Sequence, residues 1–249
     1  MFWVCLTLML LMASCSTIRM QSNMKLNMSF LSIKTIPSLP WSSPKPLIFL
    51  PRIITLGYLF IGLVLFGIGE AILIAAGSGV SPWTVLAQGV MNLTTWSVGF
   101  STFIISGSVL LLWIPLRQMP GIGTILNVII VATVIDFALY YLPITGNSFL
   151  QVIYALAGVL ITGIGGGIYL TANLGAGPRD GLMTGLQRIS GAPIAWVRNG
   201  IEVTAVIAGW TLGGVVGIGT LLFAFLIGPS VALTFFVLDK LANHSDLDS

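Results

Sequence analysis

Charged residues are scarce in this sequence, and their shortage excludes a water-soluble globular domain. Only 7% of the 249 residues are charged, whereas a typical soluble domain has about 25%. So few charges cannot cover a surface that faces water, and the long apolar runs therefore require the lipid bilayer as their solvent. The formal net charge is only +3, so the placement of the basic residues is more informative than their number.

Cysteine and histidine are also scarce. The two cysteines, Cys5 and Cys15, both precede the apolar body of the chain, so no disulfide framework holds that body together. The single histidine, His244, lies in a polar tail, and the sequence contains no cluster of metal ligands and neither a GxSxG nor an HExxH motif. We therefore expect no metal, no cofactor and no enzymatic activity. An intramembrane enzyme is an alternative that no motif supports.

What the sequence does contain is six long apolar stretches. They cover residues 53–76, 97–116, 122–143, 149–172, 195–214 and 219–239. Each has about 20 residues, which is the length that an α-helix needs to cross about 30 Å of hydrocarbon. The stretches do not alternate between apolar and polar residues, as the strands of a transmembrane barrel do. The sequence therefore predicts an all-α, polytopic membrane bundle of about six transmembrane helices.

Two further segments are too short to cross the bilayer. They are residues 81–94, between the first and second spans, and residues 177–190, between the fourth and fifth. Each begins with a proline, Pro82 or Pro178, at a plausible first helical position, where the missing N–H is not needed. We predict two short, non-spanning helices that either lie at the interface or dip into the protein.

The basic residues indicate how the chain is oriented in the membrane. Five precede the first span, with no acid among them: Arg19, Lys25, Lys34, Lys45 and Arg52. Others follow the second, fourth and sixth spans or lie at the start of the fifth: Arg117, Arg179, Arg188, Arg198 and Lys240. The loops near residues 77–96, 144–148 and 215–218 contain no Lys or Arg. Because positive charge collects on the cytoplasmic side, we predict a multi-pass protein of the cytoplasmic (inner) membrane with both termini in the cytoplasm.

The chain divides into three parts on this basis. Residues 1–51 form a poorly ordered N-terminal extension, residues 52–240 the membrane domain and residues 241–249 a cytoplasmic tail. For the apolar first residues, three interpretations stay open: a true start at a later methionine, a short seventh membrane segment, or a lipoprotein-like cleavage site. Residues 17–51 are rich in Ser, Pro and Lys, which is typical of a flexible lead.

An internal repeat is visible when the chain is shifted by 96 residues. The phrase Gly-Ile-Gly-Thr occurs at residues 121–124 and again at 217–220. In the same register, residues of the first half meet identical residues of the second: Gly67 and Gly163, Gly69 and Gly165, Ile72 and Ile168, Gly79 and Gly175, Pro82 and Pro178, Gly89 and Gly185. Because a helix, a break, a proline and a turn all fall in register, we interpret this as a duplication, with repeat 1 at about 53–143 and repeat 2 at about 149–239.

Each repeat contains three spans, and an odd number of crossings reverses the direction of the chain. The two halves are therefore expected to be oppositely oriented, as in many transporters. Matching interruptions in the two halves of such proteins point to the binding site. Here the interruptions are GVSPW (79–83) and GAGPRD (175–180). The alternative is that the duplication only makes a stable bundle.

Four acidic residues of the membrane domain are candidates for ion or substrate binding, because ionisable groups in spans usually face the interior or a wet cavity. Glu202 lies four residues after Arg198, so the two share a helix face. The simpler interpretation is a local ion pair, and the other is a coupling acid. Glu70 and Asp136 have no basic residue on their own helices, and we hypothesise that one of them binds a proton. The alternative is a carboxyl that bonds a neighbouring helix.

The fourth acid, Asp180, follows Arg179 in the first turn of the second short helix. Backbone N–H groups at a helix N-terminus favour anions. Asp180 is thus a candidate for an internal anion of its own helix, and Arg179 for binding an acidic substrate or a lipid head group. The alternative for Arg179 is ordinary anchoring at the cytoplasmic interface.

The segments NLGAGPRDGLMTGL (173–186), VRNGIE (197–202) and GWTLGGVVGIGT (209–220), with GSGVSPWTVLAQG (77–89) and RQMPGIGT (117–124) in the first half, resemble the YczE/YyaS/YitT-like family of bacterial integral membrane proteins. The resemblance covers about residues 52–240. It implies a polytopic membrane protein without an established activity. The family pattern usually has an acid after Pro-Trp, whereas this sequence has Thr84 there.

We therefore predict a small-molecule transporter or permease-like protein. The alternative is an accessory or regulatory membrane protein that acts through a partner and moves nothing. The candidate binding residues are Glu70, Pro82, Asp136, Pro178, Arg179, Asp180, Arg198 and Glu202. The expected partners are the lipid bilayer and a small molecule or ion. A homo-oligomer is compatible with the sequence, and no nucleic acid is expected.

Overall fold

The computed structural model describes residues 36–48, 50–143 and 145–245, with side chains up to Ala242. Within these residues all regular secondary structure is helical, and there is no strand. The helices are α2 (Ile53–Ala76), α3 (Pro82–Leu93), α4 (Val98–Trp113), α5 (Ile122–Tyr141), α6 (Ser148–Thr171), α7 (Pro178–Ser190), α8 (Ile194–Thr211) and α9 (Ile218–Ser245). The all-α prediction is thereby confirmed. The predictions for residues 1–35 lie outside the described residues.

The two short helices occur where the sequence predicts them. Pro82 and Pro178 both lie in the first turn, of α3 and α7 respectively, where a proline needs no N–H partner. The longer helices lie within a few residues of the predicted spans. The main difference is α9, which continues to Ser245 rather than ending near residue 239.

Four helices are long and apolar enough to cross a membrane: α2, α5, α6 and α9. The pair α3 and α4 is bent by 112° and counts as a fifth if the two form one broken span. Helix α4 has only 16 residues, and α8 is less apolar because it contains Arg198, Asn199 and Glu202. The structure is thus that of a multi-pass membrane protein with four or five candidate spans.

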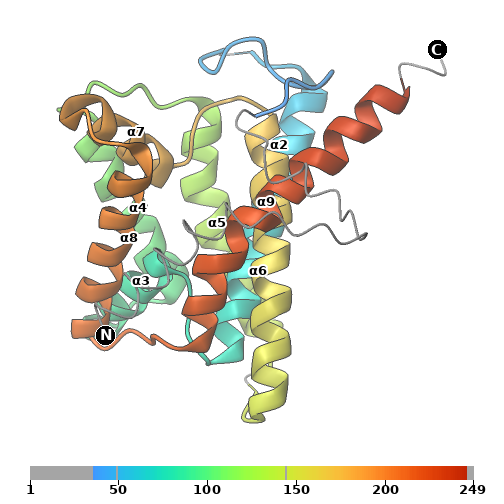
Figure 1. The fold of residues 1–249 in the computed structure, drawn as a ribbon. Coiled ribbons are helices and arrows are strands. Elements are labelled where there is room, and N and C mark those ends of the chain that lie inside the picture. Colours follow the sequence, from blue (N-terminus) through green and yellow to red (C-terminus); the bar gives the residue numbers. More distant parts are fainter. Residues whose placement is uncertain (1–35, 49, 144, 246–249) are drawn as a thin grey trace, which may run out of the picture.

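Helices α2 and α6 cross at the centre of the molecule through glycines. Figure 1 shows that they run in opposite directions. A Cβ atom built on Gly69 would lie 2.4 Å from the Thr162 backbone nitrogen, and one on Gly165 would lie 2.3 Å from that of Phe66. Small residues let the backbones of membrane helices approach closely and gain dispersion contacts that lipid cannot supply. The glycines therefore set the distance between the two helices.

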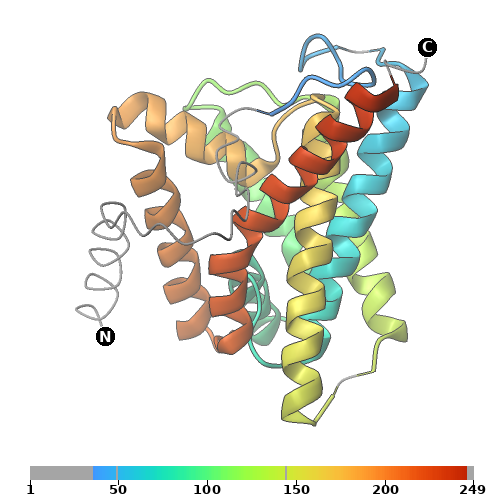
Figure 2. The ribbon, with the colours of Figure 1, turned by 45° about the vertical axis from the view of Figure 1, so that its right-hand side comes forward.

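The helices form two groups (Figure 1). Helices α2, α5, α6 and α9 pack around the central crossing, and α3, α4, α7 and α8 pack together beside them. The packing of α4 on α5 joins the groups. The short helices lie at opposite ends of the second group, with α7 near the top and α3 near the bottom of Figures 1 and 2.

Three of the four corresponding helices of the two halves start in the same register. Subtracting 82 from 178, 98 from 194 and 122 from 218 gives 96 each time. Two backbone hydrogen bonds repeat with the same offset: the Gly123 N–H donates to the Leu174 carbonyl at 2.8 Å, and the Gly219 N–H donates to the Ser78 carbonyl at 2.9 Å. In each case the loop before a short helix is held by a helix of the other half.

Residues 36–48, which belong to the predicted N-terminal extension, pack against the end of α6. The Ser43 N–H donates to the Ala172 carbonyl at 3.0 Å, and the Asn173 side chain donates to the Ser43 carbonyl at 2.8 Å. The Trp41 ring stacks on Tyr58 of α2 with centroids 4.3 Å apart. This part of the extension therefore covers the end of the α2–α6 crossing.

Candidate functional site

A cavity of about 320 Å³ lies between the two groups of helices. Its lining comes from α2 to α9, every helix of the described chain. Helix α4 packs against α5, whereas α8 and α9 make no extended contact with each other in the described structure. The cavity extends into the space between α8 and α9, and residues of both helices line it.

The cavity is lined by equivalent positions of the two halves. Six pairs of lining residues are separated by 96 positions: Pro82 and Pro178, Trp83 and Arg179, Thr102 and Arg198, Ser106 and Glu202, Asn127 and Phe223, Val131 and Ile227. Residues of both predicted interruptions, GVSPW (79–83) and GAGPRD (175–180), thus line the same cavity. The charged members of these pairs all belong to the second half, because the first half has Trp, Thr and Ser at the same places.

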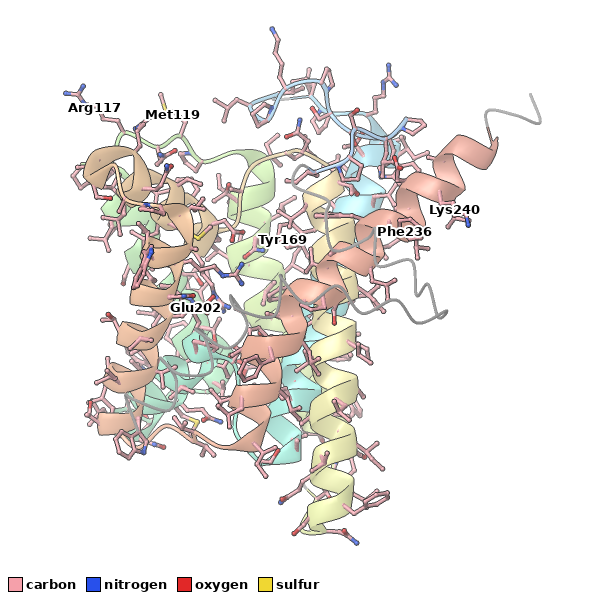
Figure 3. The ribbon with its side chains drawn as sticks, in the orientation of Figure 1. Arg117, Met119, Tyr169, Glu202, Phe236 and Lys240 are labelled. Carbon is pink, nitrogen blue, oxygen red and sulfur yellow. The ribbon has the colours of Figure 1, made fainter. Side chains whose placement is uncertain are left out.

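Arg198 and Glu202 form the ion pair that their spacing predicts. Arg198 Nε lies 3.0 Å from Glu202 Oε1, and the two side chains are 48% and 28% exposed. Figure 3 shows Glu202 on α8. Both residues line the cavity. The ion pair therefore gives one carboxylate oxygen of Glu202 a partner, and both side chains stay accessible from the cavity.

Arg179 and Asp180 lie at the start of α7 and contact different helices. The Arg179 guanidinium carbon lies 5.4 Å from the centroid of the Trp83 ring of α3, a cation–π distance. Asp180 Oδ2 accepts a hydrogen bond from the Tyr169 hydroxyl of α6 at 3.0 Å. Burial raises the pKa of the Asp180 carboxyl, and the Tyr169 hydrogen bond and the nearby Arg179 and Arg198 oppose this rise.

Trp113 fixes the start of α7. Its indole Nε1 donates to the Pro178 carbonyl at 3.0 Å, and its ring packs against Gly181, where a Cβ atom would lie only 1.9 Å from Trp113 Cζ2. A buried indole N–H needs such a partner. The contact orients the first turn of α7, so that Arg179 and Asp180 face the cavity rather than the outside of the helix group.

Glu70 lies outside the cavity lining and is fully buried between α2 and α3. Its Oε2 accepts hydrogen bonds from Ser81 Oγ at 2.8 Å and Thr84 Oγ1 at 2.7 Å. Its Oε1 has no partner among the described residues. Ser81 is the N-cap of α3 but makes no side-chain cap, so its hydroxyl joins α3 to α2 instead. Thr84 occupies the place that Asp180 has in the second half.

Asp136 also lies outside the cavity lining, and it joins α5 to α4. Its carboxylate accepts hydrogen bonds from the Ser97 hydroxyl and, at 2.8 Å, from the Gly99 N–H. Ser97 is the N-cap of α4, and Gly99 belongs to its first turn, where N–H groups lack partners within the helix. Asp136 thus has both carboxylate oxygens hydrogen-bonded, whereas Glu70 has only one.

Asp136 also explains why the two halves pack differently. Its counterpart 96 residues later is Ala232, and the counterparts of Ser97 and Gly99 are Pro193 and Ala195. The carboxylate bridge that holds α4 on α5 therefore has no equivalent between α8 and α9. The cavity extends on the side where the bridge is missing.

The structure brings six of the eight predicted residues to the cavity: Pro82, Pro178, Arg179, Asp180, Arg198 and Glu202. The other two, Glu70 and Asp136, join neighbouring helices. Sequence reasoning missed Thr102, Ser106 and Tyr169. The repeat could have identified Thr102 and Ser106 as the counterparts of Arg198 and Glu202, whereas Tyr169 lies in an apolar run without a distinguishing signal.

Comparison with known proteins identifies relatives without an assigned activity. The sequence profile of a family of unknown function, DUF6198, matches residues 53–235. An uncharacterized protein of Haemophilus influenzae is 37% identical over 211 residues, which are 85% of this chain and 96% of the relative. The uncharacterized membrane protein YczE of Bacillus subtilis is 36% identical over 177 residues, covering 69% of this chain and 80% of YczE.

The uncharacterized protein YyaS of Bacillus subtilis is a more distant relative. It is 27% identical over 179 residues, covering 69% of this chain and 87% of YyaS. These matches confirm the resemblance to YczE and YyaS. No solved structure matches the chain.

Proposed function

The chain belongs to DUF6198, a family of unknown function, and from that premise we propose that it is a small-molecule transporter built from two oppositely oriented halves. The observation that carries this proposal is the cavity lined by residues 96 positions apart, such as Ser106 and Glu202. In transporters with inverted repeats, the substrate site lies at the interface of the repeats and includes the breaks of discontinuous helices. Pro82 and Pro178, which lie at the starts of the two short helices, both line the cavity and so meet this description.

In this proposal α4 and α8 also cross the membrane, which gives six crossings. The antiparallel course of α2 and α6 and the placement of α3 and α7 at opposite ends of the molecule support the inverted arrangement. The distribution of charge supports it too. In Figure 3, Arg117 lies at the end of the molecule where α7 lies, and Lys240 lies in the same half. We assign that end to the cytoplasm.

The halves would transport by changing how their helix groups pack. The Asp136 bridge keeps α4 on α5, while α8 and α9 are separated by the cavity. Rocking of one helix group against the other would close this side and open the equivalent space between α4 and α5. Alternating access in inverted-repeat transporters is largely such a rigid-body movement around a fixed site.

A cysteine at the cavity tests this proposal. The Ser106→Cys variant, in a background with Cys5 and Cys15 changed to serine, is expected to react with a membrane-impermeant maleimide from both sides of the membrane, because each conformation exposes the cavity to one side. The Ser108→Cys variant on the same helix is the control. Ser108 is exposed outside the cavity and should face lipid, so it should stay unlabelled. If Ser106→Cys is labelled from neither side, the accessory role is favoured instead.

A further inference from the structure

We infer, building on the transport function proposed above, that Arg179 and Trp83 form the subsite for the head group of an organic anion whose apolar part occupies the rest of the cavity. The head group is a carboxylate or a phosphate, both of which guanidinium N–H groups bind with charge-assisted hydrogen bonds. The inference rests on which charges of the cavity already have partners and which do not.

Arg179 is the charged group of the cavity whose hydrogen-bonding capacity is unused. Its guanidinium carries five N–H donors, and in the described structure none of them donates a hydrogen bond or joins a salt bridge. Its contact is with the Trp83 ring, 5.4 Å from the ring centroid. Both side chains are partly buried and line the cavity. A guanidinium shielded in this way favours an anionic partner that supplies acceptors.

Each of the other charged groups of the cavity lining already has a hydrogen-bond or ion-pair partner. Arg198 Nε is bonded to Glu202 Oε1 at 3.0 Å. Asp180 Oδ2 accepts the Tyr169 hydroxyl at 3.0 Å. Arg179 acts on Asp180 only through its charge and makes no such bond, so its N–H donors can bind the oxygens of an anion. The neighbouring Asp180 sets a limit, since an anion must bind the N–H groups of Arg179 away from that carboxyl.

The remaining lining suits an apolar body. Phe66, Val131, Phe223, Ile227 and Phe235 all face this space, whose volume of about 320 Å³ is at the lower end of the range for small-molecule sites. The cavity extends between α8 and α9, which carry exposed apolar side chains such as Ile207 and Phe225. A free organic acid and the head group of an anionic lipid share the required chemistry.

Calorimetric titration of the purified protein in phosphatidylcholine nanodiscs tests the inference with four small probes. Phenylacetate and phenyl phosphate are the anions, benzyl alcohol is the neutral counterpart and benzylamine the cationic one, with protein-free discs as the baseline. We expect the two anions to bind and the other two to give no saturable signal. Preferential binding of benzylamine, or binding of neither anion, would overturn the inference.

Variants connect the binding to Arg179. Arg179→Gln should bind the anions about tenfold to a hundredfold more weakly, because hydrogen bonds to a charged group are lost. Arg117→Gln removes the same charge from an exposed position outside the cavity and should bind like the wild type. If Arg179→Gln does not fold, Arg179→Lys replaces it and should bind severalfold more weakly, because lysine lacks the planar fork. Wild-type affinity in the Arg179 variant would overturn the inference.

The same titration in discs that contain phosphatidylglycerol distinguishes the two sources of the anion. Suppressed phenylacetate binding in those discs identifies a lipid head group as the occupant, and unchanged binding identifies a free organic anion. Both results support the anion subsite. Failure of the subsite is also distinguishable from failure of the transport proposal, because Ser106→Cys labelling needs no anion and anion binding needs no access from both sides.

Discussion

The Gly165→Ala variant is expected to lose most of the stability of the membrane domain. A Cβ atom at this position would lie 2.3 Å from the Phe66 backbone nitrogen and 2.6 Å from the Gly62 carbonyl oxygen. Both are backbone atoms of α2, so the clash is relieved only by moving α6 away from α2. Overpacking usually costs about 1–3 kcal/mol and sometimes more. We expect about 3 kcal/mol or more here, measured as the free energy of unfolding in mixed detergent micelles.

Gly57→Ala is the matched control. Gly57 lies in α2, the partner helix of the crossing, but a Cβ atom there would meet no heavy atom within 4 Å. Alanine stabilises a helix interior relative to glycine by about 0.5–1 kcal/mol, so this variant should be as stable as the wild type or slightly more stable. Equal unfolding free energies for Gly165→Ala and Gly57→Ala would show that the α2–α6 crossing does not depend on glycine.

The Gly175→Ala variant is expected to have the second large effect, because both the backbone and the space at Gly175 exclude a side chain. Gly175 has φ +119°, and a Cβ atom there would lie 2.7 Å from Thr124 Oγ1 and 2.9 Å from Gly121 Cα. Backbone strain and overpacking then add to about 3 kcal/mol or more. The counterpart, Gly79, has φ +112° and a Cβ distance of 2.5 Å to Gly217 N. Gly79→Ala should therefore lose a similar amount of unfolding free energy.

The Gly191→Ala variant separates the effect of backbone strain from the effect of overpacking. Gly191 has φ +66°, but a Cβ atom there would meet no heavy atom within 4 Å. Its variant carries the backbone strain without the clash, and we expect it to lose about 1–2 kcal/mol. If the three alanine variants lose equal amounts, the close approach of each loop to the other half contributes nothing to stability.

The positions of the helices follow from local features of the sequence. The six apolar stretches and the two proline-led segments predict α2 to α9 to within a few residues, apart from the end of α9, because hydrophobic length and helix starts depend on neighbouring residues. The Arg198–Glu202 pair is predictable for the same reason, since its spacing alone places both groups on one helix face. Recognising the repeat adds nonlocal information, because it relates Pro82 to Pro178, and both residues line the cavity.

The partners of the buried acids depend on contacts that the sequence does not specify. Nothing near Glu70 in an apolar helix indicates that Ser81 and Thr84 fold back on it. In the same way, the bridge from Asp136 to Gly99 joins residues 37 positions apart. The sequence limits these acids to a buried or cavity-facing role, and only the packing of α3 and α4 shows that neither one lines the cavity.

The opposite orientation of the two halves is tested most directly at the ends of the short helices. Leu93 of α3 and Ile189 of α7 are 96 residues apart, and their side chains are 68% and 65% exposed. Each is changed to cysteine in a background without Cys5 and Cys15, and intact and inverted membrane vesicles are treated with an impermeant maleimide. We predict that Leu93→Cys reacts only from the outside and Ile189→Cys only from the cytoplasmic side. Reaction of both cysteines from the same side would contradict the inverted arrangement and the transport function proposed from it.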